Sequence, residues 1–141
     1  MTTEASNHIK YKLATGAIDF SSDTFKIILM DTGFTFDKDA HETYSDVSGS
    51  ELSSGNGYST GGNTLAGVSV TEDDTDDRTE VTWNNTTWTA SGGSIGPTPG
   101  AIIYDDTDGD DTIVGYIDFG GEQTQTDGGT CTISNIEVRI S

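Results

Sequence analysis

The sequence has few positively charged residues. Only 6 of its 141 residues are Lys or Arg, against 24 Asp or Glu, which gives a formal net charge of −18 at pH 7. Binding to nucleic acid or to anionic membranes depends on basic patches that meet phosphate groups. We therefore expect neither nucleic acid nor a membrane among the partners of this chain.

Cysteine and long hydrophobic runs are also scarce. Cys131 is the only cysteine, so the chain forms no internal disulfide, and its surroundings predict a strand. The longest apolar run, residues 27–30, is too short to span a membrane. Residues 1–4 carry no basic stretch and no apolar run follows them, which predicts no signal peptide.

The sequence carries no catalytic signature. His8 and His41 lie far apart, without the spaced partner that a metal or a nucleophile requires. Glu80 and Asp118 are the acids set among strand-like apolar residues, but alternation directs both away from the apolar face. We predict that the chain is not an enzyme and has neither catalytic residues nor a resident cofactor.

The acid excess has its own interpretation. Such a composition is typical of halophilic proteins, in which molar salt screens the repulsion between carboxylates. The alternative is an acidic protein from an ordinary host.

Short alternating segments dominate the rest of the sequence and predict an all-β fold. Turn residues separate them every 8–12 residues, which favours a single antiparallel β-sandwich or jelly-roll-like domain with long loops over residues 9–141. Residues 1–8 are polar and predict a flexible N-terminal arm. The expected strands cover 8–14, 17–20, 24–30, 64–71 with a bulge at Gly67, 78–83, 86–90, 101–104, 112–119 and 130–141.

Long loops connect these strands. Residues 31–54, 91–100 and 120–129 read as irregular, with a short helix over 38–44 capped by Asp37. Phe34, Phe36 and Tyr44 are expected to hold the first of these loops on the core. Residues 55–62 are rich in glycine and predict turns with positive φ.

Two acidic loops are candidate cation sites. Asp106, Asp108 and Asp110 occupy alternating positions, as ligands of Ca²⁺ or Na⁺ often do. The EF-hand pattern fails, because the positions that need Gly and Glu hold Asp111 and Ile117. An irregular site for Ca²⁺ or Na⁺ and a solvated hairpin tip both remain open, and the same holds for residues 72–77.

The aromatic residues leave a second choice open. Trp83 and Trp88 suit a packed β-core or a platform that stacks against sugars. An exposed Tyr58 or Trp88 would supply contacts to glycans.

Several segments in the same order along the chain resemble a family of small structural proteins from the particles of tailed bacterial or haloarchaeal viruses. These segments are GAIDF at 16–20, TFKIILM at 24–30, YSDV at 44–47, ELS at 51–53, GYSTGGNTL at 57–65, AIIYDDT at 101–107 and VGYIDFG at 114–120. The resemblance implies a non-enzymatic capsid decoration protein that binds the major capsid protein on the outside of the virion. It also implies a homo-oligomer, such as a trimer, and assembly in the host cytoplasm.

Two other functions stay open. One is a tail or fibre module that binds a receptor. The other is a carbohydrate- or Ca²⁺-binding adhesive module, for which Asp106 and Asp108 would supply ligands.

Overall fold

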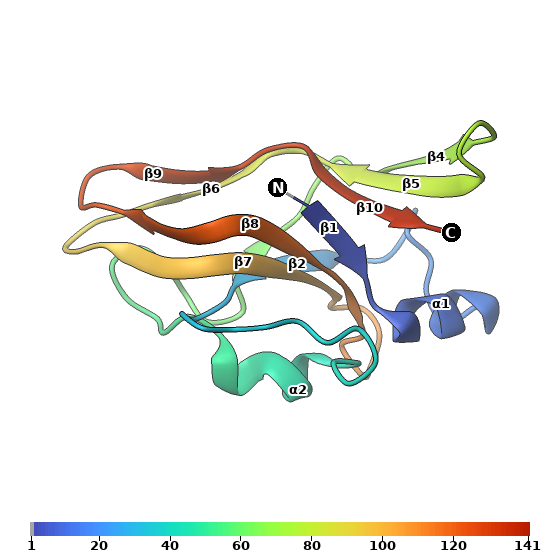
Figure 1. Cartoon of the computed structure of the whole chain (residues 1–141), viewed down its shortest axis with the longest axis horizontal. Coiled ribbons are helices and arrows are strands. Elements are labelled where there is room, and N and C mark those ends of the chain that lie inside the picture. The colour runs from blue at the N-terminus through green and yellow to red at the C-terminus, as the bar shows by residue number, and fades with distance from the viewer. Residues whose placement is uncertain (1) are drawn as a thin grey trace.

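The computed structural model describes residues 2–141, and strands are the commonest regular element among them (Figure 1). The elements, in chain order, are β1 (Thr2–Ala5), α1 (Asn7–Ala14), β2 (Phe25–Leu29), α2 (Tyr44–Val47), the 3₁₀ turn η1 (Ser48–Ser50), β3 (Asn63–Thr64), β4 (Ser69–Asp73), β5 (Arg78–Trp83), β6 (Thr86–Thr89), β7 (Ile95–Asp105), β8 (Ile113–Gln125), β9 (Thr130–Ile133) and β10 (Ile136–Ile140).

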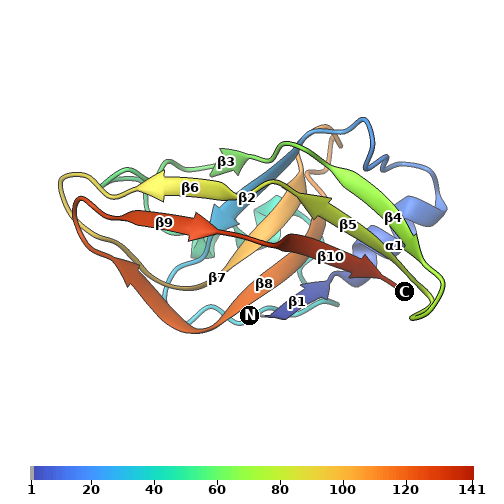
Figure 2. The same cartoon turned by 90° about the horizontal axis from the view of Figure 1, so that it is seen from above.

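The strands form two layers, which confirms the predicted all-β antiparallel sandwich. One layer is a five-stranded sheet in the order β1-β8-β7-β2-β3. The other consists of β10-β5-β4 and β6-β9, which lie end to end above the first sheet (Figures 1 and 2). Trp83 faces Ile136 and Thr86 faces Ile133, so both ladders of the second layer keep one register across the break.

The main core lies between the two layers. Phe25, Ile27 and Leu29 of β2 point into it, as period-2 alternation requires. Trp83 and Trp88 are also buried there, which agrees with core packing and leaves no exposed platform for sugars.

A second, smaller core covers the outer face of the five-stranded sheet. Ile28 and Met30 point toward it from β2 and its extension, so this strand is buried on both faces. The long segment between β2 and β3 crosses this face and carries α2 (Figure 1). Phe34, Phe36 and Tyr44 pack against the second core, which confirms their expected role.

The N-terminal predictions are wrong for the described residues. Residues 2–5 form β1, which pairs with β8, and the segment expected to be a strand over 8–14 lies in helix α1. Ser6 caps this helix by accepting a hydrogen bond from the Ile9 backbone N–H, and it donates to the Ile113 carbonyl. Ile9 and Leu13 lie four residues apart and so share a helix face, while Tyr11 is 62% exposed. Met1 lies outside the described residues.

Other element boundaries also differ from the prediction. β7 begins at Ile95 and β8 continues to Gln125, because the two strands pair far beyond their apolar parts. The expected strand over 64–71 splits into β3 and β4, with Gly67 at φ 69° between them. Asp37 accepts hydrogen bonds from the backbone of a single turn, and the helix begins at Tyr44 instead.

Among residues 2–141, no helix is long and apolar enough to cross a membrane.

Candidate functional site

The three aspartates predicted as cation ligands do not converge on one point. Asp106 faces Lys26 at 3.6 Å, whereas Asp108 and Asp110 contact the Lys12 Nζ at 3.3 and 2.9 Å. Within residues 2–141, no group of three or more acidic, His or Cys side chains is arranged to hold a metal ion. The protein's own lysines therefore lie where the cation was expected.

The other acidic hairpin has the same organisation. Arg78 lies among Asp73, Asp76 and Glu80, with N···O distances of 3.4, 3.3 and 2.7 Å. Glu80 thus pairs with an arginine on its own strand, and the hairpin is a surface ion-pair network.

Glu51, which the sequence did not single out, is the centre of a polar network. Glu51 is only 9% exposed. Its carboxylate accepts hydrogen bonds from the Tyr44 hydroxyl, from the Tyr58 hydroxyl at 2.7 Å and from the Gly61 N–H at 2.9 Å. The Tyr104 hydroxyl donates to the Gly61 carbonyl at 3.2 Å. Burial and the bond to Glu51 raise the pKa of Tyr58, so its hydroxyl remains a donor. This network fastens the segment 44–61 to the sheet.

The glycan contacts expected from Tyr58 and Trp88 are not available. Their exposed fractions are 2% and 4%, and the two rings pack against one another in the core. Cys131 is half-buried, and burial raises the pKa of its thiol, which disfavours the reactive thiolate.

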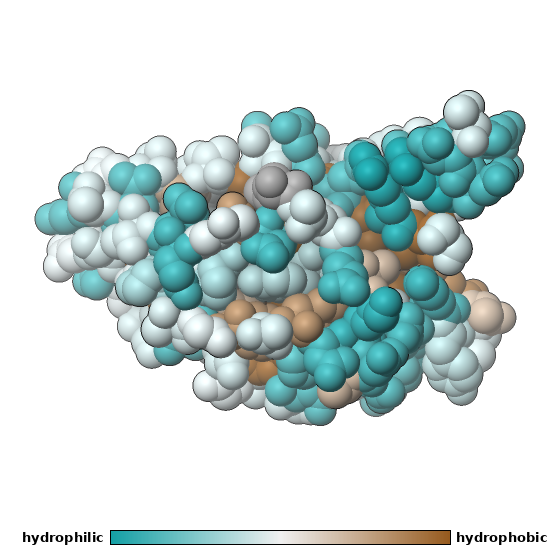
Figure 3. Space-filling view, viewed as in Figure 1, coloured by the Kyte–Doolittle hydropathy of each residue, from teal (hydrophilic) through white to brown (hydrophobic). Residues whose placement is uncertain are grey.

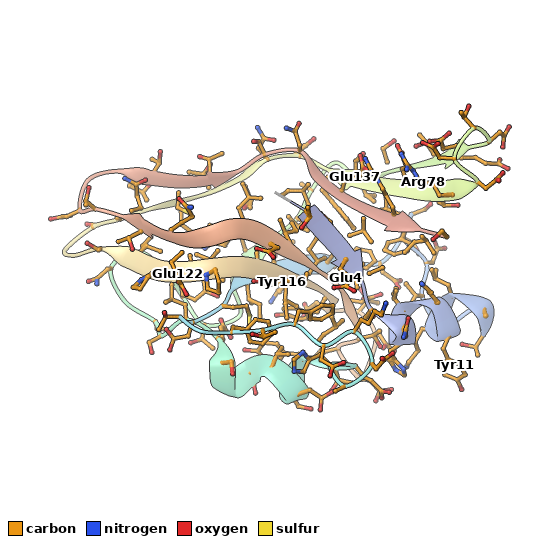
Figure 4. The ribbon with its side chains drawn as sticks, viewed as in Figure 1. Glu4, Tyr11, Arg78, Tyr116, Glu122 and Glu137 are labelled. Carbon is orange, nitrogen blue, oxygen red and sulfur yellow. The ribbon has the colours of Figure 1, made fainter. Side chains whose placement is uncertain are left out.

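A cleft of about 370 Å³ opens on the outer face of the five-stranded sheet, beside the second core. Figure 3 shows hydrophobic surface on this side of the molecule, bordered by hydrophilic residues, and Figure 4 places Tyr116 between Glu4 and Glu122. We call it the aromatic cleft; it is lined by Thr2, Glu4, Phe34, Thr35, Phe36, Pro99, Tyr116, Asp118, Gly121 and Glu122.

Strand pairing brings the floor of the aromatic cleft together. Glu4 of β1 lies opposite Tyr116 of β8, and Thr2 lies opposite Asp118. Gly100 lies on the other side of Asp118, and a Cβ there would overlap the Tyr116 hydroxyl. The absence of a side chain at Gly100 therefore lets the Tyr116 ring lie where it does.

The segment 31–36 forms the wall of the cleft. The Glu122 Oε1 accepts hydrogen bonds from the Thr32 hydroxyl and the Gly33 N–H, each at 3.1 Å, which ties this segment to β8. Phe36 stacks on Tyr116 with ring centroids 5.5 Å apart, and Phe34 meets the same ring edge-on at 5.5 Å.

The cleft is electrostatically negative. Glu4, Asp118 and Glu122 line it, and burial together with the charges of Asp118 and Glu122 raises the pKa of Tyr116 to about 12. The Tyr116 hydroxyl makes no hydrogen bond within residues 2–141, and it is not among the buried polar atoms that lack a partner there, so it is accessible from the cleft. Such a cavity suits a small group that is flat, positively charged and able to donate hydrogen bonds.

The sequence predicts the roles of some residues of this cleft, but not that they lie together. Phe34 and Phe36 were expected to pin the loop, and Asp118 was expected to point outward, as it does. Their meeting with Glu4 and Glu122 depends on the pairing of β1 with β8, which the sequence pattern did not indicate.

The chain was compared with family models, curated proteins and solved structures, and no match to any of them was found.

Proposed function

We propose that this chain is a non-enzymatic structural protein of a virus particle, which decorates the outer surface of a tailed-virus head by binding its major capsid protein. The ordered set of segments that resembles small virion proteins motivates the location. The partner and the homo-oligomeric state belong to the same proposal.

The observation that carries the non-enzymatic part is how the buried carboxylates are used. Glu51 accepts hydrogen bonds from two tyrosines and a backbone N–H, and the Asp105 Oδ1 accepts from the N–H groups of Thr107 and Asp108. Both acids fasten loops to the sheet. A general acid–base pair would need two carboxyl groups that face one substrate, whereas Glu51 and Asp105 hold two different loops.

The scaffold suits a protein that binds to a larger assembly. Its central sheet is covered on both faces, so the surface can carry polar and acidic groups without losing the core. The aromatic cleft adds a recessed contact point on one side.

The two alternatives lose their residue-level support. The receptor-binding alternative relied on exposed Tyr58 and Trp88, which are buried. The adhesive alternative relied on Asp106 and Asp108, which face two different lysines.

Rebinding to stripped heads tests the proposal. The purified protein should co-sediment with heads of the source virus that have been freed of their surface proteins. Cryo-electron microscopy of these heads should show it as regular external density. Heads that kept their surface proteins are the control and should bind little more. Density confined to the tail, or absence of the chain from purified particles by mass spectrometry, would contradict it.

A further inference from the structure

We propose that the aromatic cleft is a receptor for the guanidinium group of an arginine side chain, presented by a positively charged segment of a partner protein. This inference concerns the chemistry of the cleft and does not depend on the location of the protein in a virion.

The aromatic walls fit a flat cation. Phe36 stacks on Tyr116 and Phe34 closes the side of the same ring, so a cation would meet the outer surfaces of the half-buried Phe34 and Phe36 rings. A guanidinium group stacks on aromatic faces, where it gains both cation–π attraction and apolar contact for its stem. The cavity volume of about 370 Å³ lies near the lower end of the ~300–1,000 Å³ typical of small-ligand sites, which suits one side chain better than a larger ligand.

The carboxylates supply acceptors for the guanidinium N–H groups. Glu122 uses Oε1 for the segment 31–36, Asp118 uses Oδ1 for the Gly120 N–H, and Glu4 uses Oε1 toward Lys38. The second oxygen of each has no protein partner within residues 2–141. The Tyr116 hydroxyl, which is accessible from the cleft, is a further acceptor.

Other ligand classes fit less well. The three carboxylates do not gather closely enough to hold a metal ion, so the negative charge is spread along the cleft. This spacing suits a cation with several diverging donors, and arginine carries five N–H groups in a planar fork. Anions are repelled, and a lysine ammonium lacks the flat face that the rings can cover.

Charge complementarity identifies the kind of partner. A chain of formal charge −18 attracts basic segments at long range, and the cleft then selects an arginine from such a segment. Lys38 pairs with Glu4 at 3.7 Å at the edge of the site, and both side chains are about half exposed. The incoming cation competes with a weak surface pair there.

Peptide titration followed by ¹H–¹⁵N NMR tests the inference. A Gly/Ser pentapeptide whose only charge is that of a single central arginine should shift the amides of Gly33, Tyr116 and Gly121. Its affinity should fall as the salt concentration is raised. The citrulline peptide keeps the shape without the charge and should bind at least tenfold more weakly, as should the lysine peptide.

Two variants and one matched control locate the site. Asp118→Asn and Phe36→Leu should each weaken arginine binding by about tenfold, while circular dichroism confirms that both fold. Asp74→Asn removes the same charge from an exposed position on the β4–β5 hairpin and should leave the affinity unchanged.

Three outcomes would overturn the proposal. Equal binding of the citrulline peptide would exclude recognition of the charge. Equal weakening by Asp74→Asn would mean diffuse attraction to the acidic surface. Shifts at the same amides that appear only with rising protein concentration, without peptide, would make a second copy of this chain the occupant.

Discussion

The Tyr58 hydroxyl bridges Glu51 and β2: it donates to the Glu51 Oε2 at 2.7 Å and accepts from the Leu29 N–H at 3.1 Å. Tyr58→Phe would remove both bonds and leave a buried N–H without a partner. We expect the free energy of unfolding to fall by about 1–3 kcal/mol, measured by urea denaturation. Tyr11→Phe, which changes an exposed hydroxyl, should be neutral; equal effects of the two variants would contradict a role for the network.

Gly62 is required by its surroundings as well as by its backbone. Its φ is 69°, and a Cβ there would overlap the Ile27 carbonyl of β2. Gly33 has a similar φ of 78° but faces open space. Gly33→Ala should therefore cost only the conformational strain of about 1–2 kcal/mol, whereas Gly62→Ala should cost more or prevent folding. Similar melting temperatures for both variants would show that the close approach to β2 is relaxed at no cost.

Lys12 joins helix α1 to the loop between β7 and β8. Its side chain is largely buried and contacts both Asp108 and Asp110. Lys12→Met should lower the melting temperature by about 3–5 °C, which corresponds to ~1 kcal/mol for a domain of this size.

The same variant tests the cation hypothesis. Removing the ammonium group leaves two carboxylates without their counter-charge, so added Ca²⁺ should stabilise Lys12→Met more than the wild type. NaCl of matched ionic strength is the control. A larger Ca²⁺ effect on the wild type would revive the site predicted from Asp106, Asp108 and Asp110.

Local patterns in the sequence were sufficient for the strands that carry the core. Phe25, Ile27 and Leu29 alternate with a period of two, and a strand is the structure that puts them on one face. The same reasoning failed at the N-terminus, because Ile9 and Leu13 fit one face of a helix as well as one face of a strand, and the helix leaves Tyr11 exposed. What decides between them is tertiary: Ser6 caps the helix while bonding to β8.

The candidate site was less accessible to sequence reasoning. The aromatic cleft joins residues 2–4, 34–36 and 116–122, and only strand pairing makes them neighbours. The acidic loops showed the opposite problem, since their spacing suggested a cation site. Lys12 and Lys26, which pair with Asp106, Asp108 and Asp110, lie about 80 or more residues earlier in the chain, where no local pattern reveals the contact.

The acid excess predicts a dependence of stability on salt. Arg78 is the only base among the acids of the β4–β5 hairpin in the described structure, so carboxylates there repel one another at low ionic strength. Raising NaCl from 0.05 to 2 M reduces the screening length from more than 10 Å to less than about 3 Å, and the melting temperature should rise steadily. KCl should raise the melting temperature similarly. An uncharged osmolyte should not reproduce the steep rise of the melting temperature that low salt concentrations give. A flat salt response would argue against a halophilic adaptation.

Asp105 makes stability depend on pH near neutrality. Burial and a hydrogen bond shared with the Asp23 side chain raise its pKa to about 7, although the N–H groups of Asp108 and Thr107 oppose this shift. An aspartate in the unfolded chain titrates near 3.8, so between about pH 4 and 7 the native state holds a proton that the unfolded state releases. This contribution to stability is full below pH 4, decreases as pH rises through that window and is lost above 7.

Asp105→Asn keeps an acceptor for both N–H groups and a donor toward Asp23 without titrating. In urea denaturation, the variant should therefore gain stability relative to the wild type between pH 5 and pH 8, while Asp74→Asn should show no such trend; a constant difference for Asp105→Asn across this range would exclude Asp105 as the titrating group.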